Sequence, residues 1–109
     1  FQQVPQLHLL SYCDLMITSG GMNSIAECIE KEVPMLVCPL SLKSDQLGNS
    51  ARVVYHGLGL RARIKLDSSR TIEKRIVQLF ENYATFKRNL SMMRTKILAE
   101  STAINTEVI

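Results

Sequence analysis

A pair of glycines between an apolar run and an amphipathic pattern constrains the fold of this chain more than any other feature. The run Leu15–Thr18 is short and apolar, and Asp14 and Ser19-Gly20-Gly21 bound it. This pattern is typical of a buried strand in a parallel sheet. After the glycines, apolar residues recur at the spacing of an amphipathic helix: Ile25, Ala26, Cys28 and Ile29. The sequence therefore predicts a strand, a tight turn and a helix in direct succession.

Such a turn places the backbone N–H groups of a helix N-terminus at the carboxyl edge of the sheet, where they attract phosphate. Ser19, Asn23 and Ser24 add side-chain donors to Gly20 and Gly21. These residues indicate a site for a sugar phosphate or a nucleotide. An alternative is that the glycines only turn the chain and the polar residues only cap the helix. The stretch lacks the three-glycine dinucleotide fingerprint and the glycine-lysine phosphate loop, so both interpretations stay open.

A carboxylate lies one helical turn beyond Asn23. Glu27 occupies this position, from which it can accept hydrogen bonds from a pair of sugar hydroxyls. Together with the glycine turn, this carboxylate fits a site for a sugar phosphate or a nucleotide.

A second strand and a second polar loop follow. Val33-Pro34 ends the helix, and Met35–Cys38 is predicted as a buried strand that stops at Pro39. Two strands joined by one helix form a right-handed βαβ crossover. The pair Asp45-Gln46 then precedes a helical pattern at the same sheet edge, where open α/β sheets bind their ligands.

The role of this second pair has two interpretations. Asp45 is either an N-cap or a ligand for sugar hydroxyls, and the adjacent amide of Gln46 favours the ligand role. Asn49 and Arg52 continue the helix, and the pattern leaves open whether each faces the site or solvent.

The remainder of the chain predicts one more strand and two helices. Residues 57–60 close the preceding helix and begin a strand to about Ile64, and helices are expected from Thr71 and from about Tyr83 to Glu100. The last helix carries an apolar stripe that is expected to be core or a domain contact: Phe86, Leu90, Met93, Ile97 and Leu98.

Composition narrows the class of protein. With 109 residues and 46% hydrophobic content, the chain is one small domain or part of one. The net charge of +3 has no run of like charges, which suits anionic ligands and gives no argument for nucleic acid. No apolar stretch in this sequence is long enough for a transmembrane segment, and its first residues do not show the charged-then-apolar pattern of a signal peptide.

The cysteines and histidines give no sign of a metal or catalytic centre. Cys13, Cys28 and Cys38 are odd in number and lie in apolar segments without C-x-x-C spacing, so we expect reduced core thiols in a cytoplasmic protein, with zinc as a remote alternative. His8 is expected in a short helix over residues 7–13 as a packing residue, because no carboxylate or nucleophile accompanies it.

Several short motifs in one order resemble the donor-binding signature of the UDP-glycosyltransferases, enzymes with the GT-B fold. The resemblance covers residues 4–60. The motifs are Val4-Pro5-Gln6, Thr18-Ser19-Gly20-Gly21-Met22-Asn23-Ser24 with Glu27, Val33-Pro34-Met35, Pro39-Leu40, Asp45-Gln46 and Asn49.

The resemblance implies a Rossmann-like α/β fold, a parallel sheet with flanking helices that is part of the C-terminal domain of a GT-B glycosyltransferase. Residues 1–109 would form part of the donor-binding half, and the N-terminal acceptor domain with the catalytic base would be absent from this chain. The complete enzyme would transfer a hexose from a nucleotide sugar, expected to be a UDP-sugar, to an acceptor hydroxyl with inversion. It would need no metal and no cofactor, and the isolated chain would be inactive.

The resemblance also implies a role for each matching residue. Ser19, Gly20, Gly21, Asn23 and Ser24 would hold the diphosphate. Glu27 would bind the ribose, Asp45 and Gln46 would bind the transferred sugar, and Gln6 would border the nucleobase.

Three departures from the family pattern bear on these roles. Ser19 stands where the family usually has a histidine, Gln3 stands where many relatives have an aromatic residue, and the loop before Asp45 is about two residues longer than the common spacing. Ser19 supports an alternative of another class, a non-catalytic sugar-nucleotide-binding or auxiliary subunit that acts with a partner chain.

Overall fold

The computed structural model of the protein describes residues 14–40 and 45–108. The predictions for Gln3, Gln6, His8, Cys13 and the loop 41–44 therefore lie outside the described residues.

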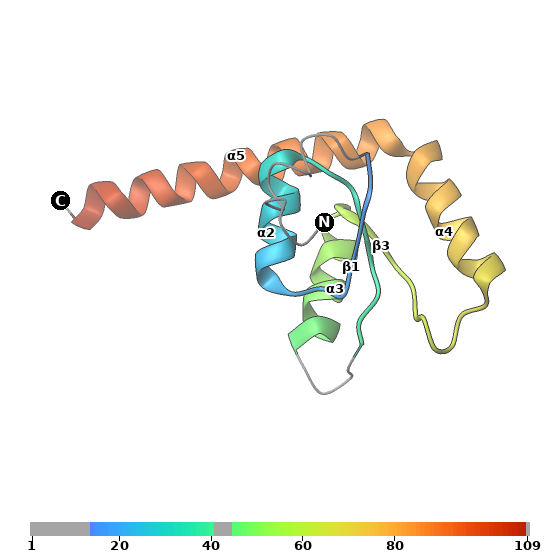
Figure 1. The fold of residues 1–109 in the computed structure, drawn as a ribbon. Helices are drawn as coiled ribbons and strands as arrows, with labels where there is room; N and C mark the ends of the chain where they lie inside the picture. The colour runs from blue at the N-terminus through green and yellow to red at the C-terminus, as the bar shows by residue number, and fades with distance from the viewer. Residues whose placement is uncertain (1–13, 41–44, 109) are drawn as a thin grey trace, which may run out of the picture.

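A parallel sheet of three strands forms the centre of the fold, in the order β1-β2-β3 (Figure 1). The strands are β1 (Met16–Thr18), β2 (Met35–Val37) and β3 (Gly59–Arg61). Two helices connect them, α2 (Met22–Lys31) and α3 (Asp45–Tyr55). The predicted strand, glycine turn and helix are confirmed, and so is the crossover to the second strand. The third strand is shorter than predicted: it ends at Arg61, and the prediction had it continue to about Ile64.

Two more helices follow, α4 (Ser69–Glu81) and α5 (Tyr83–Val108). The first begins two residues earlier than predicted because Ser68 caps it: its hydroxyl accepts a hydrogen bond from the Thr71 N–H at 3.2 Å. In Figure 1, α2 and α3 lie on one side of the sheet and α4 lies on the other. This layering is the arrangement expected when parallel strands must be covered on both faces.

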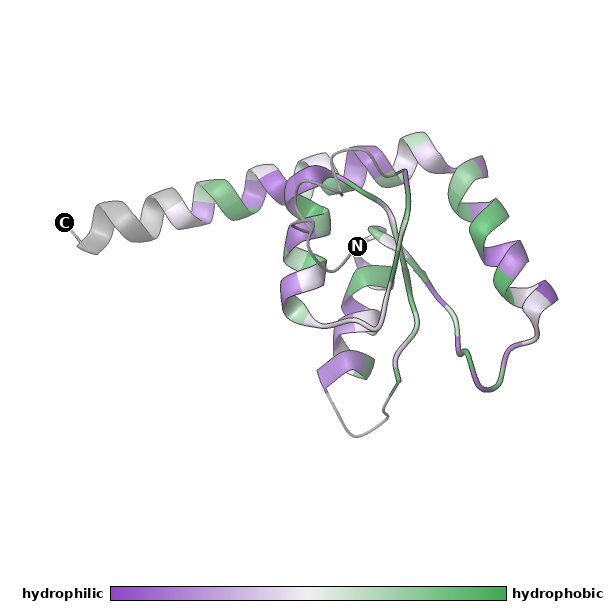
Figure 2. Ribbon diagram, in the orientation of Figure 1, coloured by the Kyte–Doolittle hydropathy of each residue, from purple (hydrophilic) through white to green (hydrophobic). Residues whose placement is uncertain are grey.

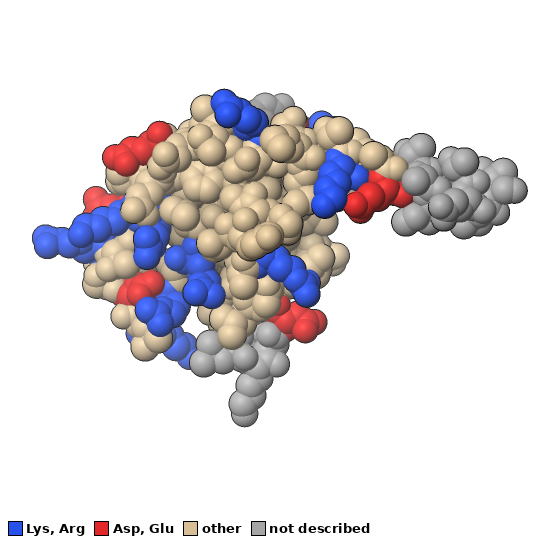
Figure 3. All heavy atoms as spheres, turned by 180° about the vertical axis from the view of Figure 1, so that it is seen from behind, with Lys and Arg blue, Asp and Glu red and all other residues tan. Residues whose placement is uncertain are grey.

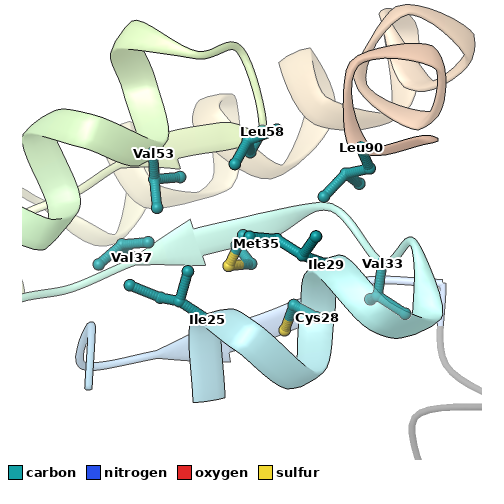
Figure 4. Close-up of a cluster of buried hydrophobic side chains, with 9 residues drawn as sticks. All are labelled: Ile25, Cys28, Ile29, Val33, Met35, Val37, Val53, Leu58 and Leu90. Atoms are coloured by element: carbon teal, nitrogen blue, oxygen red, sulfur yellow. The ribbon is translucent and has the colours of Figure 1, made fainter. Parts of the chain in front are cut away.

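The main core lies between the sheet and the pair α2 and α3. Figure 4 shows its side chains meeting around Met35, with Leu90 reaching in from α5. The cluster consists of Ile25, Cys28, Ile29, Val33, Met35, Val37, Val53, Leu58 and Leu90. A smaller cluster on the α4 side joins Leu36, Cys38, Ala62 and Leu79. In Figure 2 the strands are mostly hydrophobic while the helices alternate, as burial on one helix face requires.

The strand β1 is less buried than the sequence pattern predicts. Ile17 shares a sheet face with Leu36 in the parallel register, yet its side chain is 54% exposed. The helix on that face of the sheet is α4, and it packs mainly on β3. No described element therefore covers Ile17 on that face.

The end of α2 is fixed by contacts with α5. Glu32 adopts a left-handed conformation with φ of 55° and closes the helix through hydrogen bonds to the Cys28 and Ile29 carbonyls. Lys87 Nζ donates to the Glu32 carbonyl at 2.7 Å, and Arg94 forms an ion pair with the Glu32 carboxylate at 3.4 Å. These contacts hold the first half of α5 across α2.

The second half of α5 extends beyond the core (Figure 1). Leu90 is fully buried and Phe86 and Met93 pack against the two clusters, as the predicted apolar stripe requires. Ile97 and Leu98, which belong to the same stripe, are about half exposed. The first part of the stripe therefore packs into the core, whereas the part with Ile97 and Leu98 lies outside it.

The surface carries mixed charges, with a basic excess over residues 61–75. Six cations and two acids occur there: Arg61, Arg63, Lys65, Arg70, Lys74 and Arg75 against Asp67 and Glu73. Seen from behind, Lys and Arg side chains gather on the side where α4 lies (Figure 3).

The two described cysteines, Cys28 and Cys38, are buried reduced thiols, as predicted. Burial raises the pKa of the Cys38 thiol, and the nearby charge of Asp67 raises it further. No cluster of three or more histidine, cysteine, aspartate or glutamate side chains suited to a metal ion occurs in residues 14–40 and 45–108. Nor is any helix in those ranges both long and apolar enough to span a bilayer.

Tyr83 links the start of α5 to the segment before β1. Its hydroxyl donates to the Asp14 carbonyl at 2.8 Å. Burial raises the pKa of Tyr83, and the charge of Asp14 raises it further. Because the folded state favours the protonated phenol, this contribution to stability is present below the usual tyrosine pKa of about 10 and is lost above it.

We predict that Tyr83→Phe lowers the free energy of unfolding at pH 7 by about 0.5–1.5 kcal/mol, the worth of one hydrogen bond. The difference from the wild type should narrow as the pH rises through about 10. Denaturant titrations at several pH values measure both effects. Tyr55→Phe is the matched control, because Tyr55 is 85% exposed. An equal loss in both variants would contradict the role of the Tyr83 hydroxyl.

Candidate functional site

The glycine turn after β1 is a conformation that only glycine adopts easily. Gly20 has φ of +95°, in the region that disfavours other residues. A Cβ atom there would lie 2.9 Å from Val37 Cγ1 and 3.2 Å from the Gln46 carbonyl oxygen. The Gly20 N–H donates to the Thr18 hydroxyl at 3.3 Å. The turn therefore lies tightly between the end of β2 and the start of α3.

Asn49 braces this turn from α3. Its side chain is 5% exposed, and its Nδ2 donates to the Gly20 carbonyl at 2.9 Å. The sequence left open whether Asn49 faces the site or solvent, and the structure places it beneath the turn. A buried amide bonded to a backbone carbonyl of another element fixes the relative position of the two. Asn49 therefore joins the glycine turn to α3, the helix that begins with the predicted pair Asp45-Gln46.

Within the described residues, no side chain caps the N-terminus of α2. Gly21 occupies the N-cap with φ of −67°, a conformation available to any residue, and has no side chain to cap the helix. A Cβ atom there would meet nothing within 4 Å. Neither backbone strain nor packing within the described residues thus requires a glycine at this position. A ligand that approaches the first turn closely would require one.

The predicted phosphate donors lie around this open end. Ser19 is half-buried in the turn, and the first turn of α2 contains Asn23, which is exposed, and Ser24, which is half-buried. That turn contains no acidic residue of its own that would offset the partial positive charge of the helix terminus. Glu27 is half-buried one turn further along α2.

The second predicted pair lies at the start of α3. Asp45 is exposed in the first turn. Gln46 is half-buried, and its Oε1 accepts a hydrogen bond from the Leu40 N–H at 3.0 Å. This bond ties the end of β2 to α3, so a ligand for the Gln46 oxygen would compete with it.

The structure brings most of the predicted residues to one edge of the sheet. The glycine turn and the start of α3 touch through Gly20, Gln46 and Asn49. The sequence left open the roles of Arg52, which is exposed and lines a hollow at α3, and of Asn49. Its spacing of three from Gln46 was the available clue, since residues three apart share a helix face.

A hollow of about 460 Å³ opens beside this edge, between α2 and α3. Its walls come from Met22 of α2 and from one side of α3: Asp45, Gly48, Asn49 and Arg52. A narrower, mostly apolar crevice of about 160 Å³ continues from it toward α5, with Arg52 and His56 among its lining residues. A larger hollow of about 650 Å³ is lined by α4 alone, from Arg70 to Glu81. The α4 hollow includes none of the predicted site residues.

A model of the glycosyltransferase family 28 C-terminal domain matches residues 6–107. This chain belongs to that family. The fold is accordingly that of the C-terminal half of a GT-B glycosyltransferase, as the motifs predicted.

Individual relatives agree with the family match. The chain is 34% identical over 101 residues to zeaxanthin glucosyltransferase of Pantoea ananas, covering 92% of this chain and 22% of that protein. It is 35% identical over 81 residues to human UDP-glucuronosyltransferase 3A1, covering 72% of this chain and 15% of the relative. The solved structure of the glycotransferase of kitacinnamycin superposes with a TM-score of 0.80 at 33% identity, covering 90% of this chain and 25% of that one. The chain thus spans a quarter or less of the length of each.

The two glycines of the turn give a matched pair for mutation. We predict that Gly20→Ala lowers the free energy of unfolding by about 1–3 kcal/mol, because its Cβ would overpack against Val37 and the Gln46 backbone. Gly21→Ala should change it by less than about 0.5 kcal/mol, since its Cβ meets open space. Thermal or denaturant unfolding of both variants measures the difference. Equal stability of the two variants would contradict this account of the turn.

Proposed function

We propose that this domain binds the nucleotide-sugar donor of an inverting glycosyltransferase, with a UDP-sugar as donor and an acceptor hydroxyl as the site of transfer. The observation that carries the proposal is the α2 N-terminus at Gly21, which no described side chain caps and which Asn49 braces through Gly20. Its first helical residue, Met22, lines a hollow together with Asp45. Family membership supports the class of reaction.

Each part of the donor has a chemically suitable partner at this edge. The diphosphate would lie at the first turn of α2, where backbone N–H groups and the side chains of Ser19, Asn23 and Ser24 donate hydrogen bonds. The ribose hydroxyls would donate to the Glu27 carboxylate. The transferred sugar would lie toward Asp45 and Gln46, and the nucleobase would border Gln6, which is outside the described residues.

In the proposed reaction, this domain binds the donor and stabilises the negative charge that develops on it. In a direct displacement, the acceptor oxygen bonds to the anomeric carbon as the bond to the diphosphate breaks, and the configuration inverts. Negative charge then grows on the leaving diphosphate, where the α2 terminus and its donors would stabilise it without a metal. The base that takes the acceptor proton would come from an N-terminal acceptor domain outside this chain, so the chain alone would not catalyse transfer.

The sugar and the nucleobase are less constrained than the diphosphate. The similar proteins include one named a glucosyltransferase and one named a UDP-glucuronosyltransferase, so the family admits different sugars. A UDP-hexose is the donor that we propose to test first.

One observation favours a second candidate, a non-catalytic sugar-nucleotide-binding or auxiliary subunit. Ser19 is a short neutral donor at the position where the UDP-glycosyltransferases usually have a histidine, and it would hold the phosphate less strongly. Turnover of a UDP-sugar by the complete protein, with an acceptor domain in the same open reading frame, would exclude this candidate.

The test of the proposed site is calorimetric titration of the complete protein with UDP and UDP-glucose. We predict that Glu27→Ala weakens UDP binding at least tenfold, or about 1.4 kcal/mol, because the ribose hydroxyls lose their acceptor. Asp45→Ala should weaken UDP-glucose binding while leaving UDP binding unchanged, because UDP has no transferred sugar.

The matched control is Glu73→Ala, which removes an exposed carboxylate from α4, away from the site. It should leave both affinities unchanged. Unchanged binding in the Glu27 and Asp45 variants would overturn the assignment of the donor site.

A further inference from the structure

The outer edge of β3 has no partner strand among the described residues, because the sheet order β1-β2-β3 gives β3 one neighbour. The Leu58 carbonyl accepts a hydrogen bond from the Met35 N–H at 3.3 Å. The Ala62 N–H donates to the Val37 carbonyl at 3.0 Å. Residues 58 and 62 thus face β2, and alternation along the strand directs the backbone N–H and C=O of Arg61 away from the sheet. Such an edge can pair with another extended chain.

A hollow of about 510 Å³ follows this edge. Leu60 packs against the cluster on the α4 side, so Arg61, the next residue of the strand, points to the α3 side. Both line the hollow, which therefore lies along the outer edge of β3, between α3 and α4 (Figure 1). The full set of lining residues comes from all three elements: Ala51, Val54, Tyr55, Leu60, Arg61 and Arg75.

The α3 wall of this hollow is largely apolar. Ala51, Val54 and Tyr55 occupy positions i, i+3 and i+4 and share one helix face. All three side chains are exposed. Large side chains left on the surface beside an unpaired strand edge are typical of an interaction surface.

The charged groups of the hollow are positive and are not paired with acids. Arg61 and Arg75 contribute two guanidinium groups, and no acidic side chain is among the described residues that line the hollow. The ion pairs between described residues include neither arginine. Arg75 Nη1 donates to Gln78 at 3.2 Å, while its Nε has no hydrogen-bond partner among the described residues. Carboxylates are the acceptors that suit such guanidinium groups.

We propose that the hollow along β3 is a docking site for an extended acidic segment of a partner protein, which adds a strand to the sheet. The backbone of the segment pairs with the free β3 edge, and its side chains point alternately to the α3 and α4 sides. Two adjacent acidic residues then reach Arg61 on one side and Arg75 on the other, while apolar neighbours pack on Val54 and Leu60. The docking site shares no residue with the proposed donor site and does not depend on it.

Charge favours an acidic partner over a second copy of this chain. Pairing of two β3 edges would bring the arginines of both copies together, and like charges opposite each other destabilise a strand pair. The basic excess over residues 61–75 surrounds the hollow with further positive charge, which attracts an acidic segment from a distance.

The experiment measures fluorescence anisotropy of a labelled peptide, Gly-Val-Val-Glu-Glu-Val-Val-Gly, with the complete protein. We expect saturable binding that weakens roughly tenfold or more when both glutamates of the peptide are replaced by glutamine. Arg61→Gln and Arg75→Gln should each weaken binding roughly fivefold. The matched control is Arg88→Gln, which removes an exposed cation from α5 and should bind as the wild type does.

Backbone methylation of the peptide separates strand addition from charge attraction alone. Methyl groups on alternate peptide nitrogens block one edge of the extended peptide and leave the other edge free. Methylation of the edge that meets β3 should abolish binding, and methylation of the opposite edge should leave it unchanged.

Three outcomes overturn the proposal. Equal binding of the two methylated peptides would show that the segment does not add a strand. Unchanged binding in the Arg61 and Arg75 variants would show that the hollow is not the docking site. If the acidic peptide does not bind at all, the two arginines only protect the strand edge from pairing.

Discussion

The arrangement of the site depends on one buried hydrogen bond, from the Asn49 side chain to the Gly20 carbonyl. Gly20 holds a left-handed conformation in a space too small for a Cβ atom, so the turn tolerates little variation. The bond fixes that turn to α3 across 29 positions of sequence. As a result the open terminus of α2 and the first turn of α3, which carry different groups, keep one relative position. A site that binds two ends of one ligand requires that its two parts keep such a fixed relative position.

The core supplies the frame on which that bond is placed. Three short parallel strands give little stability by themselves, and burial of β2 between helices on both faces holds them together (Figure 4). Glu32, Lys87 and Arg94 then attach α5 to the opposite end of α2. Both ends of α2 are thus fixed, one by the glycine turn and the other by α5, and its N-terminal N–H groups point out of the carboxyl edge.

The sequence predicted much of this fold because its periodic patterns are local. The apolar run before Gly20, the helical spacing after it and Val33-Pro34 each fix their own segment without knowledge of the rest. The predictions were weaker where tertiary contacts decide. The exposure of Ile17 and the division of the α5 stripe between Met93 and Ile97 depend on which elements cover them. The place of Asn49 beneath the turn and the hollow at Gly48 depend on two helices meeting, which no single segment encodes.

The central claim is that the α2 terminus at the glycine turn binds the diphosphate of a nucleotide sugar. A crystal structure of the complete protein with UDP tests it most directly. The account predicts phosphate oxygens within about 2.7–3.2 Å of backbone nitrogens in the first turn of α2, with the ribose beside Glu27. UDP bound elsewhere, such as in the hollow along α4, with the terminus at Gly21 left to solvent, would contradict the account.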